Sequence, residues 1–301
     1  SVNITFAKFD FRINKWATMS NNMSFYSSGY DFQGVGNVEN VIAYGARHFL
    51  ANYTLKNPDG TWVYAVPYQS YRVGNGRHAI VGNNNNINKR DRTDFSNTTQ
   101  LVIKPVDSFW ITGNFTYRFR QNRNTSRTTN FAYRVNPDDQ LSYYTSGAGL
   151  NELAESIATY QYKAANIFAT YDEEFGSHHV GATVGWNMET QYYKNISASV
   201  ENLISDKLND LGLAGPDATT GEIIDNVGGG QTEYALMGFF GRANYDYKGR
   251  YLLEVSARYD GTSRFAAGQR WGFFPSASVG WRISEEPFFS SIKNTVNNLK
   301  L

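Results

Sequence analysis

The chain has 301 residues, a formal net charge of +1 and 41% hydrophobic residues. No apolar run approaches the ~20 residues that a membrane-spanning helix needs, and the near-neutral charge gives no support for nucleic-acid binding. The absence of cysteine excludes disulfides and thiolate metal sites. Aromatic residues make up 16% of the chain, a composition typical of β-strands.

Segments in which apolar and polar residues alternate recur along the chain, and each is predicted to be a β-strand. The first lies at residues 1–11, and others cover 109–119, 178–188, 237–247, 251–260 and 276–284. An alternation of about ten residues is nearly long enough to cross a membrane, whereas most strands of globular proteins have five or six residues.

The segment 251–260 illustrates the expected orientation of such a strand. Leu253, Val255 and Ala257 form an apolar face that would meet lipid, whereas Ser256 and its even-numbered neighbours would meet water. Aromatic residues at both ends of the segment are typical of the two membrane interfaces. Ordinary aromatic pairs between strands of a soluble β-sandwich remain the alternative interpretation.

Short and long connections between these segments alternate strictly. Short turns are predicted at 14–18, 104–108, 174–178 and 248–250, and long connections at 32–94, 121–158, 193–231 and 261–272. Two short loop helices are predicted at 150–157 and 199–213, where apolar residues have helical spacing. The alternation of connection lengths is typical of outer-membrane β-barrels, which have short periplasmic turns and long extracellular loops.

The most specific signal lies in residues 238–289. Its motifs are GRANYDY (241–247), KGRYLLE (248–254), RYDGTSRF (258–265), RWGFFPS (270–276) and GWRISEEP (280–287). This region closely resembles the signature region of SusC/RagA-type TonB-dependent outer-membrane transporters. The resemblance implies an all-β fold, an antiparallel transmembrane β-barrel of about 22 strands with an N-terminal plug. It also implies that the protein lies in the cell outer membrane, in contact with membrane lipid.

Nine strands and the start of a tenth, at 298–301, can be counted in the sequence. No plug sequence is recognised, so residues 1–301 are expected to form the central part of a single barrel domain. The resemblance implies import of nutrient oligomers, which are glycan or peptide fragments. Its implied partners are a SusD-type surface lipoprotein and the TonB complex, reached through a segment outside this sequence. The alternatives are a porin-like barrel and a soluble β-sandwich carbohydrate-binding module.

No arrangement of residues indicates an enzyme, a metal site or a cofactor. The carboxylates at 138–139 and 173–174 are adjacent in sequence, and adjacent residues of a strand point to opposite faces. Neither pair is therefore expected to act as a catalytic acid and base. The same geometry argues against a metal site at His178 and His179, of which His179 is expected to face the lumen.

Two groups of residues are candidates for function. The first is a row of charged residues predicted to face the lumen, where they would pair across strands and contact the plug: Arg242, Glu254, Arg258, Asp260 and Arg282. The second is an aromatic-rich loop, whose rings suit contacts with a ligand or with the partner lipoprotein: Trp62, Tyr64, Tyr68, Tyr71 and Arg72.

Overall fold

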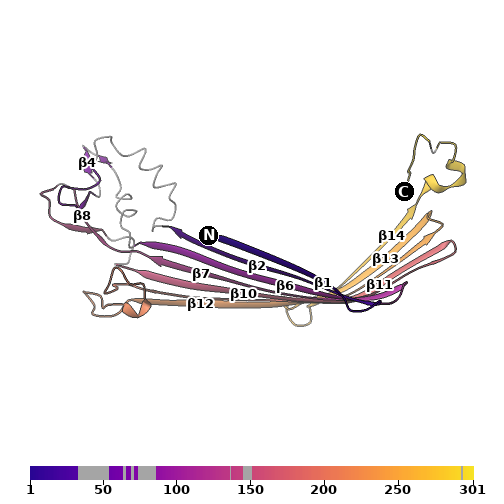
Figure 1. The fold of residues 1–301 in the computed structure, drawn as a ribbon, viewed down its shortest axis with the longest axis horizontal. Helices are drawn as coiled ribbons and strands as arrows, with labels where there is room; N and C mark the ends of the chain where they lie inside the picture. The colour runs from indigo at the N-terminus through magenta and orange to yellow at the C-terminus, as the bar shows by residue number, and fades with distance from the viewer. Residues whose placement is uncertain are drawn as a thin grey trace.

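The computed structural model describes residues 1–32, 54–63, 66–68, 71–73, 86–135, 137–144, 151–292 and 294–301. Its main element is a nine-stranded antiparallel sheet in which neighbouring strands follow one another in the chain (Figure 1). The strands are β1 (Val2–Arg12), β2 (Ala17–Phe32), β6 (Ile87–Val106), β7 (Phe109–Arg127), β10 (Leu153–Phe175), β11 (His178–Val200), β12 (Asp225–Tyr247), β13 (Tyr251–Thr262) and β14 (Trp271–Trp281). Within the described ranges, no helix is long and apolar enough to cross a membrane.

The connections between strands confirm the predicted alternation of lengths. Short turns join β1 to β2, β6 to β7, β10 to β11 and β12 to β13, and longer segments make the other connections. Figure 1 shows the four short turns near one end of the sheet, and the first residues of β6, β10 and β12 at the other. The predicted tenth strand begins where Lys300 bridges Arg282 and the Trp281 amide donates to the Leu301 carbonyl oxygen at 3.0 Å.

Short strands and 3₁₀ turns lie at the two ends of the large sheet. At the end with long connections, β3 (Trp62–Val63), β8 (Phe131–Arg134) and β9 (Ser142–Tyr144) form one sheet, and β4 (Val66–Tyr68) and β5 (Tyr71–Val73) form another. After β14 come the 3₁₀ turns η2 (Ile283–Glu285) and η3 (Pro287–Phe289).

Glu286, between these two turns, fastens them to the sheet. Its carboxylate accepts hydrogen bonds from the Tyr251 hydroxyl at 2.6 Å, the Trp281 indole at 3.2 Å and the Arg250 guanidinium at 3.1 Å. The Tyr251 hydrogen bond, followed by that of Trp281 and by the Arg250 charge, holds the pKa of Glu286 below its usual range.

Both predicted loop helices are wrong. Residues 153–157 are extended because they begin β10, and β11 continues to Val200, so that only the 3₁₀ turn η1 (Leu211–Leu213) forms in 199–213. Leu153, Val200 and Leu203 are buried together, with Leu211 packed against them. Apolar residues with helical spacing therefore build a small core that ties the connection to the ends of the strands.

The two faces of the large sheet differ in polarity. One face, which we call the outer face, carries large apolar side chains that are at least 36% exposed, among them Ile111, Val184, Phe239, Leu253 and Val279. The strand registers place these residues on the same side of the sheet. The opposite side, the inner face, carries polar and charged residues. The predicted orientation of the segment 251–260 agrees with this division.

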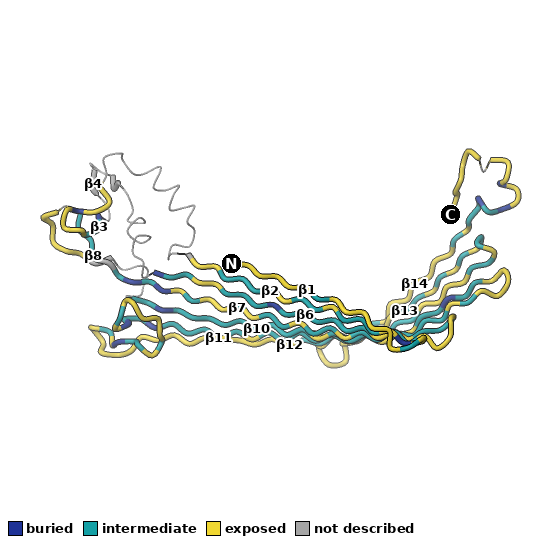
Figure 2. The backbone as a smooth tube through the Cα atoms, viewed as in Figure 1, coloured by how far each residue is buried: buried dark blue, intermediate teal, exposed yellow. Residues whose placement is uncertain are grey.

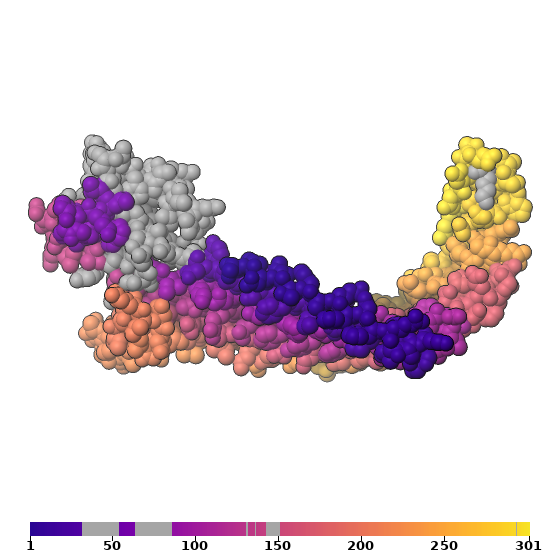
Figure 3. All heavy atoms as spheres, in the orientation of Figure 1, coloured from indigo at the N-terminus to yellow at the C-terminus, as the bar shows by residue number. Residues whose placement is uncertain are grey.

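The sheet does not cover its apolar face with a second layer. The accessible surface is 19535 Å², whereas a folded globular protein of 33.9 kDa exposes about 12,800 Å². Figure 3 shows the strands as one thin, curved slab, and Figure 2 shows the edge strands β1 and β14 as mostly exposed. A β-sandwich buries such a face against a second sheet, so this architecture requires lipid, or another apolar medium, on the outer face.

The height of the apolar band can be read along the strands. On β11, apolar residues point outward from Val180 to Met188, and the next outward residue is Thr190. On β12, the outward residues are apolar from Tyr245 to Ala235. Ten residues at ~3.3 Å each, tilted by ~40°, rise ~25 Å, which is the usual height of a lipid-facing band. Because β10, β11 and β12 each have 23 residues, they extend well beyond this band on the side of the long connections.

Candidate functional site

The inner face of β12 and β13 holds four of the five predicted lumen residues. Arg242 on β12 lies 3.7 Å from Glu254 on β13, measured from Nε to Oε1, so this pair joins two strands. Arg258 donates from Nε and Nη2 to the Asp260 carboxylate at 3.0 and 2.8 Å. Arg282 stands apart, because its Nη1 donates to the Gly249 carbonyl oxygen at the short turn. The four residues thus form two ion pairs, and their contact with a plug stays a prediction.

The predicted loop group is divided between two small sheets. Trp62 belongs to β3, which pairs in parallel with β8, and the Lys56 ammonium lies 4.3 Å from its ring centroid. Tyr68 and Tyr71 are backbone partners in the β4–β5 pair, and Arg72 is the partner of Pro67. Tyr64 lies outside the described residues. The structure therefore joins three of the five residues in one pair of strands.

The adjacent histidines point to opposite faces, as predicted. The His178 ring hydrogen-bonds to the hydroxyl of Tyr245 on the outer face, and the His179 ring lies 3.2 Å from the Asp172 carboxylate on the inner face. Among the residues that the structure describes, no group of three or more His, Cys, Asp or Glu side chains could hold a metal ion.

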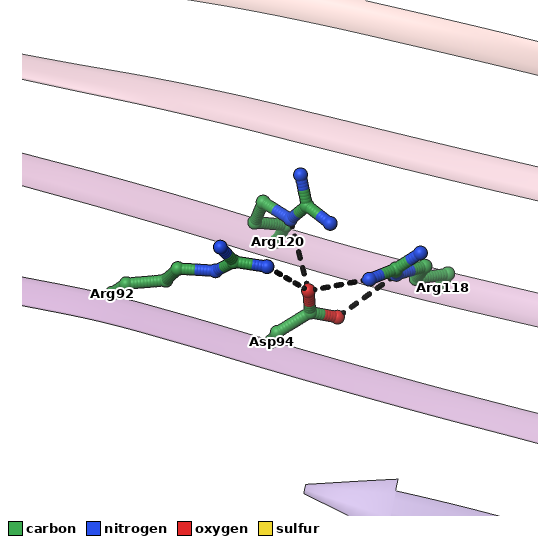
Figure 4. Close-up of polar contacts among 4 residues, drawn as sticks. All are labelled: Arg92, Asp94, Arg118 and Arg120. Atoms are coloured by element: carbon green, nitrogen blue, oxygen red, sulfur yellow. Dashed lines mark hydrogen bonds and ion pairs between the residues drawn. The ribbon is translucent and has the colours of Figure 1, made fainter. Parts of the chain in front are cut away.

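The densest polar arrangement on the inner face lies on β6 and β7, and sequence reasoning missed it. Three guanidinium groups surround one carboxylate, that of Asp94 (Figure 4). Arg118 donates to it from Nε at 3.0 Å and from Nη2 at 2.7 Å. Arg120 donates from Nε at 2.9 Å and Arg92 from Nη2 at 3.0 Å. We call these four residues the Asp94 cluster.

Aromatic rings adjoin the Asp94 cluster on both sides. The Arg120 guanidinium lies 5.8 Å from the ring centroid of Tyr160, and that of Arg92 lies 5.3 Å from the Tyr26 ring. A depression beside the cluster is also lined by hydroxyl and amide side chains, which are those of Ser96, Thr116, Tyr162 and Gln191. Such a mixture of guanidinium, aromatic and neutral hydrogen-bonding groups is typical of binding sites for polar ligands.

A weak sequence signal for the cluster existed. Arg92 and Asp94 are two residues apart, as are Arg118 and Arg120, and residues with this spacing share a face of a strand. What the sequence could not supply was the register, which makes Arg120 the direct partner of Asp94 across β6 and β7. The register brings Arg92 and Asp94 on β6 next to Arg118 and Arg120 on β7, so that the four residues form one cluster.

The nine-stranded sheet has the two faces of an outer-membrane β-barrel wall, which is apolar toward lipid and polar toward the lumen. The family model described as "TonB dependent receptor-like, beta-barrel" matches residues 9–291. The chain therefore belongs to this family of outer-membrane proteins, and the predicted all-β, antiparallel fold of a barrel segment and the predicted outer-membrane location are confirmed.

Individual relatives agree with this assignment. The chain is 26% identical over 303 residues to TonB-dependent receptor P39 of Formosa agariphila, a match that covers 98% of this chain and 26% of the relative. It is 32% identical over 166 residues to TonB-dependent receptor SusC of Bacteroides thetaiotaomicron, covering 54% of this chain and 15% of the relative. The chain thus spans about a quarter or less of the length of these relatives.

Solved structures show the same fold. The structure of the RagAB peptide transporter aligns with a TM-score of 0.69 at 19% identity, over 96% of this chain and 31% of that one. The RagAB peptide importer in the "open-open" state aligns with a TM-score of 0.67 at 18% identity, over 95% of this chain and 30% of that one. With the sequence matches, these structures confirm the resemblance to SusC/RagA-type barrels.

Proposed function

We propose that this chain forms part of the barrel wall of an importer that carries nutrient oligomers across the outer membrane with energy from TonB. The observation that carries the proposal is the family match over residues 9–291. The structure supports it with a sheet that has an apolar outer face and a charged inner face, as a wall between lipid and a wet lumen requires. The role is binding and transport, in line with relatives named as receptors and transporters.

We also propose that residues 1–301 are the central part of one barrel domain of about 22 strands. Supporting this are the consecutive strand order and the two edges of the sheet, β1 and β14, which leave backbone groups available for further strands. At the β14 edge, Lys300 and Leu301 already begin such pairing. The plug would fill the lumen beside Arg242, Glu254, Arg258 and Asp260.

The partners proposed for the whole protein are a SusD-type lipoprotein at the extracellular mouth and the TonB complex on the periplasmic side. The match to SusC and the alignment with RagAB favour this assembly. The loop residues Trp62, Tyr64, Tyr68, Tyr71 and Arg72 are the proposed contacts with ligand or lipoprotein. The cargo is proposed to be a glycan or a peptide fragment.

The second candidate is a porin-like barrel, which would pass solutes without an energy source. To separate the two, the gene of the full-length protein would be deleted in its own bacterium and then restored. Uptake of labelled oligosaccharides and peptides would be measured with TonB intact and with TonB removed. Import predicts that uptake of one class depends on both the gene and TonB. Uptake that needs the gene but continues without TonB would favour the porin-like barrel.

A further inference from the structure

We propose that the Asp94 cluster is a recognition site for carboxylate groups, and that it selects acidic oligomers, such as uronate-bearing oligosaccharides or acidic peptides. The inference deepens the proposed function, on which it relies for taking the ligand to be an oligomer. It concerns residues on β6 and β7 that lie apart from the charged pairs of β12 and β13.

The first argument is the excess of positive charge. Three guanidinium groups share one carboxylate, which leaves two positive charges without a counter-charge in the cluster. Within the part of the chain that the structure describes, Arg92, Arg118 and Arg120 form ion pairs with Asp94 alone. Glu189, on β11, instead accepts a hydrogen bond from the Tyr162 hydroxyl at 2.7 Å. An anionic ligand would neutralise the excess.

The second argument is that the charges are fixed and yet accessible. The Asp94 side chain is only 8% exposed, whereas those of Arg92 and Arg118 are 42% and 46% exposed. Asp94 therefore acts as a buried anchor that orients the three guanidinium groups. Arg120 uses Nε toward Asp94, so that both of its terminal nitrogens can donate to a ligand. A planar guanidinium with two free donors matches the two oxygens of a carboxylate.

The third argument is the position of the cluster in the wall. Asp94 is twelve residues from the short turn that ends β6 at Val106, which corresponds to a height of ~30 Å along the barrel axis. Arg242 is only five residues from the end of β12 at Tyr247, at ~13 Å. The cluster therefore lies at the extracellular limit of the apolar band, where an incoming ligand passes. It lies well above the Arg242–Glu254 pair, and above Asp260, which is nine residues from the start of β13 at Tyr251, at ~23 Å.

The fourth argument is the neighbourhood, which suits an oligomer more than a small anion. Beside the guanidinium groups lie the Tyr160 and Tyr162 side chains and the polar groups of Thr116 and Gln191. The Tyr160 ring also packs against Tyr193, with 4.7 Å between centroids. The depression has a volume of about 440 Å³, within the range of ligand sites. Ring faces and neutral donors can contact the units on either side of a bound carboxylate.

The test uses the full-length protein purified in detergent, with binding measured by isothermal titration calorimetry. The acidic probes are tetragalacturonate and tetraglutamate, and the neutral controls of equal length are maltotetraose and tetraglutamine. The variant R118Q/R120Q removes two guanidinium groups but leaves Asp94 paired with Arg92. The matched control is Arg123→Gln. Arg123 lies on the same strand but on the outer face, is exposed, and forms no ion pair within the described residues.

We expect at least one acidic probe to bind, and R118Q/R120Q to weaken it by about 10- to 100-fold, since charge-assisted hydrogen bonds are lost. R118Q/R120Q should bind the neutral probes as the unsubstituted protein does. R123Q should bind the acidic probes with the affinity of the unsubstituted protein. Which acidic probe responds distinguishes a uronate from a peptide carboxylate. The proposal is overturned if no acidic probe depends on Arg118 and Arg120, or if R123Q weakens binding equally.

One further outcome would also overturn the proposal. If R118Q/R120Q leaves all binding unchanged but lowers the hydrogen-exchange protection of the plug, a carboxylate of the protein itself occupies the cluster. Because the titration needs no TonB, its failure would leave the proposed import untouched. Conversely, uptake that continues without TonB would refute energised import without affecting the binding result.

Discussion

Replacing Val184 with lysine tests directly whether the outer face of the sheet meets lipid. Val184 lies on β11 with 62% of its surface exposed. Its removal therefore costs little packing within the sheet. The change in stability should come almost entirely from the medium around the new ammonium group. Thr183, the preceding residue, points to the inner face and provides the matched control, Thr183→Lys.

The expected size of the effect follows from the position of Val184 along its strand. It is six residues from the start of β11 at His178, which places it ~15 Å above the turn and near the middle of the ~25 Å band. A lysine on the lipid face at this depth costs about 2–4 kcal/mol, and one near the interface about 0–1 kcal/mol. Val180 is only two residues from the start of β11 at His178, close to the membrane interface. Val180→Lys should therefore cost only about 0–1 kcal/mol.

The assay is urea unfolding of the full-length protein after folding into lipid vesicles. We expect V184K to lower the free energy of unfolding by about 2–4 kcal/mol, V180K by about 1 kcal/mol or less, and T183K by a similarly small amount, because the inner face is solvated. Equal losses for V184K and T183K would refute the assignment of the two faces. Equal losses for V184K and V180K would refute the assignment of the band height.

Three further predictions concern packing, the plug and pH. Gly185→Ala should destabilise the protein by about 1–3 kcal/mol, since its Cβ would lie 2.9 Å from a backbone oxygen of β10; Gly113→Ala, with no atom within 4 Å, should be neutral or stabilising in the same unfolding assay. Truncating Arg242 and Arg258 in the full-length protein should loosen the plug, and unchanged plug protection in hydrogen exchange would contradict this. Because folding lowers the pKa of Glu286, the ionised carboxylate contributes fully to stability above the ordinary glutamate pKa of ~4.3, and this contribution is lost as the pH falls. The urea midpoint of unfolding should therefore fall less steeply between pH 6 and pH 3 in E286Q than in the unsubstituted protein.

Alternation of residue type was enough to predict the strands near the short turns. In 178–188 and 237–247, one face meets lipid and the other meets water, so apolar and polar residues alternate strictly along the sequence. The same strands continue to Val200 and begin at Asp225, where both faces meet water. Without a difference in solvent there is no difference in polarity, and the sequence signal disappears although the backbone pairing continues.

The candidate sites were predictable to different degrees for a related reason. Arg242, Glu254, Arg258 and Asp260 lie within nine residues of a short turn, and the pairing of β12 with β13 is regular from that turn onward, which fixes the register and places the four residues on one face. The Asp94 cluster lies nine to fourteen residues from the turn between β6 and β7, beyond an irregularity in the register near Val106. A shift of one residue there would have put Asp94 and Arg120 on opposite faces, so alternation alone could not bring them together.

The length of the central strands sets a requirement on any partner anchored in the membrane. Strands of 23 residues rise ~55 Å along the axis, of which lipid covers ~25 Å. The loops are therefore displayed ~30 Å above the lipid surface. A protein held in the outer leaflet by an acyl chain must cross that distance before its folded part can cover the mouth. At ~3.4 Å per extended residue, its tether needs about nine residues between the lipid anchor and the first folded element.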